Sequence, residues 1–325
     1  MRTILKFGGT SVATKRALDA LVRIVAEVSG ERAVVVSATA GTTDALVRAA
    51  EAARAGDLSE AERIVRELET KHRTLVGELF GRGEQPAAEA ALRDLSSATE
   101  RTVELLHSVA LLRELTARTR DAVLSYGERV SAPIVAALLT ARGIESTAIS
   151  AERVILTDDR FGSANPLMDE TRQRARAELG PLLGGGKVPV VTGFIGATAD
   201  GLTTTLGRGA SDYTAGILAD ALDADQCLIY TDVSGVMSAD PRLVKDARPL
   251  ATLSYAEIAE LSYYGAKVLH PRAVLPAIEK RIPVRILNTF APKDHGTTIT
   301  AVAERDGSVV KATTSLGGLG LVTVQ

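Results

Sequence analysis

The chain has 325 residues and a formal net charge of −2, and 46% of its residues are hydrophobic and 24% charged. The length predicts one large α/β unit or about two domains, with room for a sizeable core. The balanced charge and the 3% aromatic content without tryptophan argue against a nucleic-acid surface. A single cysteine, Cys227, excludes an internal disulfide framework and a cysteine-based zinc site.

The start of the chain alternates strand and helix patterns. Residues 3–7 are a short apolar run ending in a glycine turn, and residues 17–28 carry apolar side chains at helical spacing. Residues 33–36 form a second, β-branched run. This order predicts an α/β fold with a partly parallel sheet. A helical block without strands is expected over residues 44–118.

Helix and strand patterns continue to the end of the chain. Helices are expected over residues 125–143, 169–179, 212–222, 254–264 and 271–280. Strands are expected over residues 147–150, 187–192, 226–230, 283–287 and 297–300, with a hairpin or loop at 196–209 and two strand fragments in 311–325. Ser211 or Asp212 is expected to cap the helix that begins near residue 212.

Neither the N-terminus nor any internal run reads as a targeting or membrane segment. The apolar run at the start is too short for a signal peptide, and no run approaches the 18 or so apolar residues that span a bilayer. The four histidines lie far apart in sequence and form no metal-ligand pattern, so no protein metal site is predicted. Cys227 lies within an apolar strand and is expected in the core. We expect a cytoplasmic protein with no nucleic-acid or membrane partner.

The strongest local signal is a lysine at the end of the first predicted strand. Lys6 places an ammonium beside the backbone of Gly8 and Gly9, and the following helix adds the positive potential of its N-terminus. These groups together suit phosphate oxygens. A strand-to-helix turn that needs glycine for its backbone explains the same residues equally well. The chain has neither a GxxxxGK[ST] loop nor a GxGxxG motif.

Three further motifs combine small residues with charge. In residues 203–214, Arg208 offers a planar fork for a carboxylate among small residues that let a ligand reach the backbone. Thr231 and Asp232 follow a predicted strand, at the end where α/β sheets hold ligands, although turn residues of an ordinary loop give the same pattern. Lys267 stands beside a glycine, and only 9 of the 38 basic residues are lysines.

Eight motifs occur in one order along the chain. They are KFGGTSV at Lys6, SATAGTTD at Ser37, SYGERVSA at Ser125, DRFGSANP at Asp159, GFIGA at Gly193, TTTLGRGASDYTA at Thr203, TDVSGVMSADPR at Thr231 and YGAKVLHP at Tyr264. From about residue 3 to about residue 300, this ordered set resembles the catalytic region of aspartate kinases, in the amino acid kinase family.

The resemblance implies a fold and a domain plan. The fold is a three-layer α/β/α sandwich around a mainly parallel eight-stranded sheet, with the helical block as an insertion. Residues 1–300 form the catalytic domain, with an amino-acid-binding lobe over about 1–185 and a nucleotide-binding lobe over about 186–300. Residues 301–325 are a linker and the start of a truncated ACT-like regulatory segment. A homo-oligomer is implied, with a regulatory domain or subunit absent from this chain.

The resemblance also implies a reaction and a set of site residues. Aspartate kinases transfer the γ-phosphoryl group of ATP to the side-chain carboxylate of L-aspartate, giving 4-phospho-L-aspartate at the entry to lysine, threonine and methionine biosynthesis, with Mg²⁺ bound through the nucleotide phosphates. The implied catalytic residues are Lys6 and Asp212. The implied aspartate-binding residues are Thr43, Glu128, Arg208, Gly209, Ala210 and Ser211. The implied nucleotide-binding residues are Lys6, Phe7, Gly8, Gly9, Ser11, Thr231, Asp232, Met237, Arg242, Lys267 and Val268.

Two alternatives stay open. One is another amino acid kinase, acting on glutamate or N-acetylglutamate; the combination of Glu128 with Arg208 favours a free α-amino acid over an acetylated one. The other is a catalytically silent partner subunit that binds an amino acid, which the retained charges of Lys6, Asp212 and Lys267 argue against.

Overall fold

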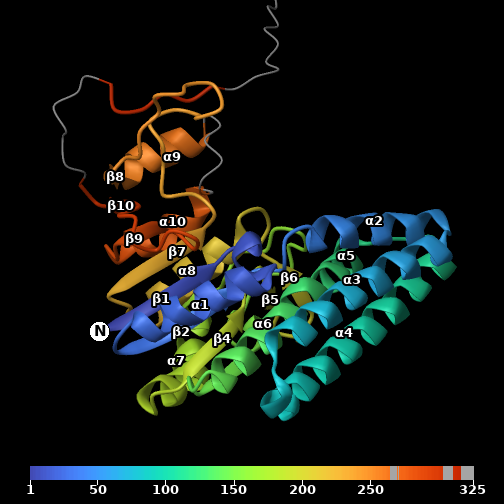
Figure 1. Ribbon diagram of the computed structural model, residues 1–325. Helices are drawn as coiled ribbons and strands as arrows, with labels where there is room; N and C mark the ends of the chain where they lie inside the picture. The colour runs from blue at the N-terminus through green and yellow to red at the C-terminus, as the bar shows by residue number, and fades with distance from the viewer. Residues whose placement is uncertain (264–268, 270, 303–309, 316–325) are drawn as a thin grey trace, which may run out of the picture.

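A computed structural model describes residues 1–263, 269, 271–302 and 310–315 of the chain. Eight strands form one sheet at its centre (Figure 1) in the order β3-β4-β2-β1-β7-β9-β10-β8. They are β1 (Arg2–Phe7), β2 (Glu31–Val36), β3 (Ser146–Ile149), β4 (Val188–Thr192), β7 (Gln226–Thr231), β8 (Thr252–Ser254), β9 (Val284–Asn288) and β10 (Thr297–Thr300). Only the β9–β10 pair is antiparallel among these described strands, so the mainly parallel eight-stranded sheet is confirmed.

Helices cover both faces of the sheet, as expected for three layers. The helices are α1 (Lys15–Glu27), α2 (Thr42–Ala55), α3 (Leu58–Leu79), α4 (Gln85–Leu112), α5 (Ala117–Leu124), α6 (Tyr126–Ala141), α7 (Met168–Gly184), α8 (Ala210–Ala221), α9 (Tyr255–Tyr263) and α10 (Pro271–Glu279). Short 3₁₀ turns span Gly9–Val12, Arg82–Glu84 and Ala151–Arg153, and a small hairpin pairs β5 (Ile195–Ala197) with β6 (Thr203–Thr205).

Alternation along β1 assigns its side chains to two separate cores. Leu5 and Phe7 pack in the cluster that contains α1 and α6, whereas Ile4 packs in the cluster that contains α7 and α8. Because successive strand residues point to opposite faces, Lys6 shares the α8 face with Ile4. Cys227 of β7 is buried on this face too, and burial raises the pKa of its thiol to about 12, so its expected place in the core is confirmed.

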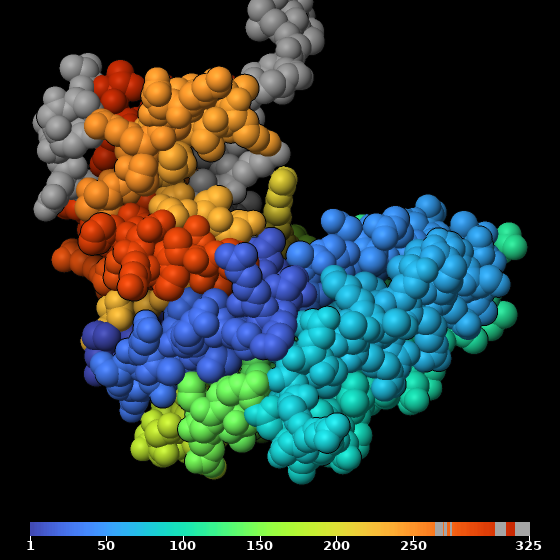
Figure 2. Space-filling view, in the orientation of Figure 1, coloured from blue at the N-terminus to red at the C-terminus, as the bar shows by residue number. Residues whose placement is uncertain are grey.

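Helices α2 to α5 form a helical arm beside the sheet (Figure 1). The arm confirms the helical block expected over residues 44–118, and its apolar faces continue the α1–α6 core. Figure 2 shows the surface hollowed between this blue arm and the orange part of the chain. The stretch Ala117–Ala141 is long and apolar enough to cross a membrane, but 78% of its apolar window is buried inside the protein, as in a core helix.

Two local expectations are wrong or lie partly outside the described residues, and one short strand was not expected. The cap of α8 is Gly209, at φ 71°, so Ser211 and Asp212 lie within the first turn. Glycine adopts this left-handed conformation at no steric cost, and no described side chain caps the helix there. The strand expected from residue 311 is absent over 311–315, and residues 316–325 lie outside the described part. Strand β8, only three residues long, was not expected.

Candidate active site

An ion pair joins the end of β1 to the start of α8. Lys6 Nζ lies 2.5 Å from Asp212 Oδ1, and the two side chains are only 9% and 16% exposed. Asp212 sits in the first turn of α8, where the helix dipole favours a negative charge. The pair thus holds an ammonium at the carboxyl edge of the sheet, which is where open α/β sheets bind ligands.

A cavity of about 400 Å³ adjoins this pair, between the starts of α2 and α8. Its walls include all six residues predicted to bind aspartate. The full lining is Lys6, Gly9, Ser37, Ala38, Thr39, Ala40, Gly41, Thr43, Asp44, Glu128, Phe194, Gly207, Arg208, Gly209, Ala210, Ser211 and Asp212. We call this space the polar cavity, and residues 37–41, which form one wall, the substrate loop.

Glu128 lines the polar cavity with a carboxylate that is only partly satisfied. The side chain is 3% exposed; Oε1 accepts a hydrogen bond from Ala38 N at 2.9 Å, and Oε2 has no hydrogen-bond partner among the described residues. Burial raises the pKa of Glu128 to about 8, against the opposing effects of the Ala38 N–H and the Lys6 charge. Such an oxygen is a ready acceptor for a ligand ammonium group.

A glycine permits this placement of Glu128. A Cβ on Gly127 would lie 2.4 Å from the Ala38 Cβ, so only glycine lets the start of α6 approach the substrate loop this closely. That approach puts the Glu128 carboxylate within reach of the Ala38 N–H.

Arg208 supplies the opposite charge at the mouth of the polar cavity. Its side chain is exposed, and within the described part of the chain no carboxylate forms an ion pair with it. A cavity with a buried carboxylate and a guanidinium that can turn inward matches a zwitterion, because an α-amino acid carries one ammonium and one carboxylate.

Asp121 of α5 fixes the hairpin that leads to Arg208, and the sequence analysis missed it. The side chain is 1% exposed. Its Oδ2 accepts hydrogen bonds from Gly162 N and Thr205 N, and its Oδ1 accepts one from Thr205 Oγ1, each at 2.8 Å. Burial nevertheless raises the pKa of Asp121. No sequence signal marks a contact across 84 residues of chain.

Asp121→Asn is expected to lower the free energy of unfolding by about 2 kcal/mol. The amide oxygen can keep the two backbone N–H bonds made to Oδ2, but these bonds lose their charge assistance, and the amide N–H₂ would face the Thr205 hydroxyl that now donates to Oδ1. Urea denaturation measures this loss. Asp19→Asn, an exposed carboxylate paired with Lys15, is the matched control and should change stability little. Equal stabilities of the two variants would contradict the assigned role.

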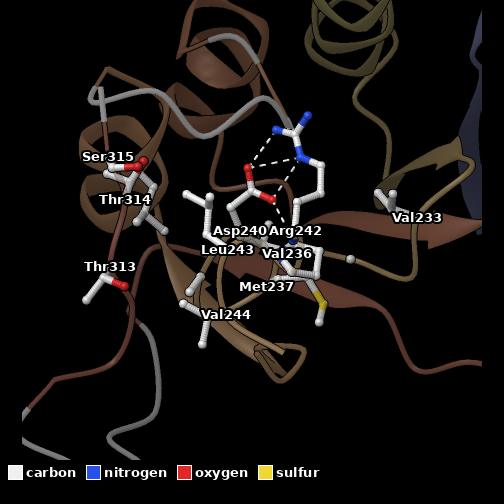
Figure 3. A pocket seen from close by; sticks show the side chains of 14 residues that line it. Val233, Val236, Met237, Asp240, Arg242, Leu243, Val244, Thr313, Thr314 and Ser315 are labelled. Atoms are coloured by element: carbon white, nitrogen blue, oxygen red, sulfur yellow. Dashed lines mark hydrogen bonds and ion pairs between the residues drawn. The ribbon is translucent and has the colours of Figure 1, made fainter. Parts of the chain in front are cut away.

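A second cavity, of about 650 Å³, lies beyond the end of β7 (Figure 3). Its lining is largely apolar and includes the predicted Met237 and Arg242. The other lining residues are Val233, Gly235, Val236, Ala239, Asp240, Pro241, Leu243, Val244, Leu261, Thr313, Thr314 and Ser315. Arg242 forms an ion pair with Asp240 at 2.6 Å, and residues 313–315 lie across the cavity from Val233 (Figure 3). We call it the apolar cavity.

Five other predicted nucleotide residues, Phe7, Gly8, Ser11, Thr231 and Asp232, lie around the ends of β1 and β7 and line neither cavity, whereas Lys6 and Gly9 line the polar cavity. Gly8 N donates to Tyr230 O at 3.0 Å, and the Phe7 ring stacks on Tyr230 within the core, with centroids 5.0 Å apart. Ser11 is buried, with its Oγ 2.6 Å from Thr289 Oγ1, and Thr231 Oγ1 donates to Asp232 Oδ1 at 3.2 Å. Their nucleotide roles stay predictions, and Lys267 and Val268 lie outside the described residues.

Phe194 also escaped the sequence analysis. It lines the polar cavity with φ at 69°, a conformation that is strained for a bulky side chain and tends to occur at functional sites. Its N–H donates to Thr214 Oγ1 and its C=O accepts from Leu206 N, which hold the turn in place.

The sequence model of the amino acid kinase family matches residues 1–288. The chain therefore belongs to the amino acid kinase family.

Within that family its similarity is to aspartokinases. It is 36% identical over 301 residues to lysine-sensitive aspartokinase 3 of Escherichia coli, covering 91% of this chain and 63% of the relative. It is 35% identical to the chloroplastic aspartokinase 1 of Arabidopsis thaliana, covering 94% of this chain and 53% of the relative. The crystal structure of E. coli aspartokinase III with aspartate and ADP superposes with a TM-score of 0.85 at 34% identity, over 94% of this chain and 65% of that one. This chain thus spans about half to two thirds of the length of these relatives.

Proposed function

We propose that this chain transfers the γ-phosphoryl group of ATP to the side-chain carboxylate of L-aspartate, giving 4-phospho-L-aspartate as the first step towards lysine, threonine and methionine. The observation that carries the proposal is the buried carboxylate of Glu128, whose Oε2 has no partner among the described residues, in a residue that lines one cavity with Arg208 and Lys6. The similarity to a structure described as a complex with aspartate and ADP supports the same substrates.

In this proposal the polar cavity holds aspartate by both ends of its zwitterion. Glu128 Oε2 accepts hydrogen bonds from the ammonium, and Arg208 binds the α-carboxylate. Thr43, Ser211 and the backbone at Gly209 and Ala210 line the remaining wall, so that the side-chain carboxylate is directed towards Lys6.

Phosphoryl transfer then needs little proton chemistry. An aspartate carboxylate is ionised at pH 7, so one of its oxygens can attack the γ-phosphorus directly while the bond to the β,γ-bridging oxygen breaks and ADP leaves. Lys6 neutralises charge that spreads over the transferring group, and Asp212 holds the Lys6 ammonium in place at 2.5 Å.

The nucleotide occupies the apolar cavity in this proposal, with Met237 against the base and Arg242 free to exchange Asp240 for a phosphate. Gly8, Gly9, Ser11, Thr231, Asp232, Lys267 and Val268 complete the predicted set. Mg²⁺ would be held through the nucleotide phosphates and would offset their charge when bound.

The assembly and the compartment belong to the same proposal. Residues 1–300 act as one catalytic unit with an amino-acid lobe and a nucleotide lobe, in a homo-oligomer that works in the cytoplasm with a regulatory domain or subunit. The two cavities at the ends of β1 and β7 support the division into lobes. The buried, unpaired Cys227 is compatible with a reducing compartment.

An acyl phosphate assay tests the reaction. The chain is incubated with ATP, Mg²⁺ and either L-aspartate, L-glutamate or N-acetyl-L-glutamate, and hydroxylamine traps the acyl phosphate as a hydroxamate. We expect hydroxamate from aspartate at a rate far above that from the other two acids. Hydroxamate from glutamate alone would move the assignment to a glutamate-type kinase, and none from any acid would favour the silent subunit.

A further inference from the structure

A buried histidine on the helical arm contacts the wall of the polar cavity from outside. His72 of α3 is fully buried, and its Nδ1 lies 2.7 Å from Leu68 O. A carbonyl oxygen only accepts, so Nδ1 carries the hydrogen. Burial lowers the pKa of His72 to about 4, so the ring is neutral at pH 7 and its Nε2 is an acceptor.

The tautomer fixes the direction of a hydrogen-bond chain into the substrate loop. Thr39 Oγ1 lies 3.0 Å from His72 Nε2 and must donate to it. The Thr39 oxygen then accepts from Thr42 Oγ1 at 2.7 Å, at the start of α2. All three side chains are buried, so each of these bonds forms away from water, where an unmade bond costs most.

The neighbouring residue on α3 binds the same loop. Lys71 Nζ donates to Ala40 O at 2.8 Å. On its other side the loop faces the reaction site, since Ala40 N donates to Gly9 O at 3.1 Å and Ala38 N donates to Glu128 Oε1. The loop is therefore held between α3 and the groups that bind substrate.

We propose that His72 and Lys71 are positioning residues, which hold the substrate loop through Thr39 and Ala40 so that Ala38 N–H meets Glu128 in the geometry that binds the ammonium of the substrate. The inference rests on the proposed function for its substrate. It makes α3, a helix of the arm outside the sheet, part of the machinery that sets amino-acid affinity.

Two substitutions of His72 separate positioning from packing. In His72→Asn the amide N–H₂ can keep the bond to Leu68 O, but nothing accepts from Thr39. In His72→Gln the longer amide can place its oxygen near the Nε2 position and accept from Thr39. We expect His72→Asn to raise the KM for aspartate on the order of tenfold, the effect of one lost buried hydrogen bond, with a much smaller change in kcat, and His72→Gln to recover most of that loss.

Thr39→Val tests the same bond from the loop side, and it applies even where a His72 variant folds poorly. It should raise the KM at least as much as His72→Asn, because it also removes the acceptor of the Thr42 hydroxyl. The double variant should be no worse than Thr39→Val alone, because both changes remove the same Thr39–His72 bond. Thr102→Val is the matched control, since Thr102 is a buried threonine of α4 whose hydroxyl, among the described residues, donates to Ala98 O within its own helix.

A measurement without substrate keeps this inference separate from the proposed function. Hydrogen exchange of residues 37–41 in the ligand-free protein should be faster in His72→Asn and Thr39→Val than in wild type, and unchanged in Thr102→Val. Unchanged exchange in both variants, or a KM for His72→Gln as poor as that for His72→Asn, would overturn the inference. A wild-type chain that forms no aspartyl hydroxamate would refute the proposed function instead and leave the exchange result to decide on the positioning.

Discussion

Lys6→Met is expected to lower kcat for aspartyl phosphate formation by on the order of a thousandfold or more, the range seen when a cationic group is removed from a phosphoryl-transfer site. Methionine nearly conserves the length of the side chain but removes the ammonium that lies 2.5 Å from Asp212 Oδ1. No positive charge at the end of β1 then neutralises the negative charge on the transferring phosphoryl group. Hydroxamate formation at saturating aspartate and ATP measures the effect.

The controls for Lys6 address folding and general charge. Lys15→Met removes an exposed lysine of α1 that pairs with Asp19, and it should turn over like wild type. Adding Asp212→Asn to Lys6→Met removes the carboxylate that the first change leaves unpaired, so thermal stability should recover while activity stays lost. Turnover by Lys6→Met within tenfold of wild type would reject the role of Lys6.

Glu128→Gln is expected to raise the KM for aspartate by on the order of a hundredfold, because a charge-assisted hydrogen bond to the ammonium becomes a neutral one. In wild type the KM should depend on pH. Burial raises the pKa of Glu128 to about 8, so below pH 8 most of the free protein carries the protonated, non-binding form. The KM should therefore rise as pH falls from 8 to 6, approaching tenfold per unit, whereas the KM of the glutamine variant should stay flat.

The free energy of unfolding should fall as pH rises, whereas the affinity for aspartate should improve. The folded-state pKa of Glu128 is raised from 4.5 to about 8, so the stability linked to its proton is present below pH 4.5 and is lost as pH rises through 8. Glu128→Gln lacks this loss and should exceed wild type in unfolding free energy at pH 8.5 by about 2 kcal/mol or more, but differ little at pH 4.5. Urea denaturation at the two pH values measures this. Glu51→Gln, on the exposed face of α2, is the control and should change neither the KM nor the pH dependence of stability. A wild-type KM for Glu128→Gln would show that Glu128 does not bind the substrate.

The sequence predicts the sheet well because strands and strand ends carry short-range patterns, whereas Asp212 was joined to Lys6 only through the family resemblance. Alternation along residues 3–7 assigns Lys6 to one face and Phe7 to the other, and strand ends carry the glycines and small residues of the polar cavity. Arg208 and Glu128 were each predicted from a motif within one continuous stretch of sequence. The resemblance supplied their pairing in one site, and the cavity brings them together.

Features that depend on packing between distant segments could not be predicted. Asp121 reaches Thr205 across 84 residues, and His72 reaches Thr39 across 33, because of how helices of the arm lie against the sheet. Isolated, Asp121 reads as a polar residue of an amphipathic helix, and His72 as one of four scattered histidines. The cap of α8 was misassigned because serine and aspartate usually cap helices, whereas here Gly209 begins the helix with a positive φ.

Because Cys227 is buried, we expect the native protein not to react with thiol reagents. The thiol is 1% exposed, and burial keeps it protonated with a pKa of about 12, whereas alkylation requires a solvent-accessible thiolate. Because it is the single cysteine, the rate at which it becomes alkylated reports how often β7, at the centre of the sheet, opens to solvent. A fluorophore can likewise be attached to a cysteine introduced in the substrate loop, with the native residue left in place.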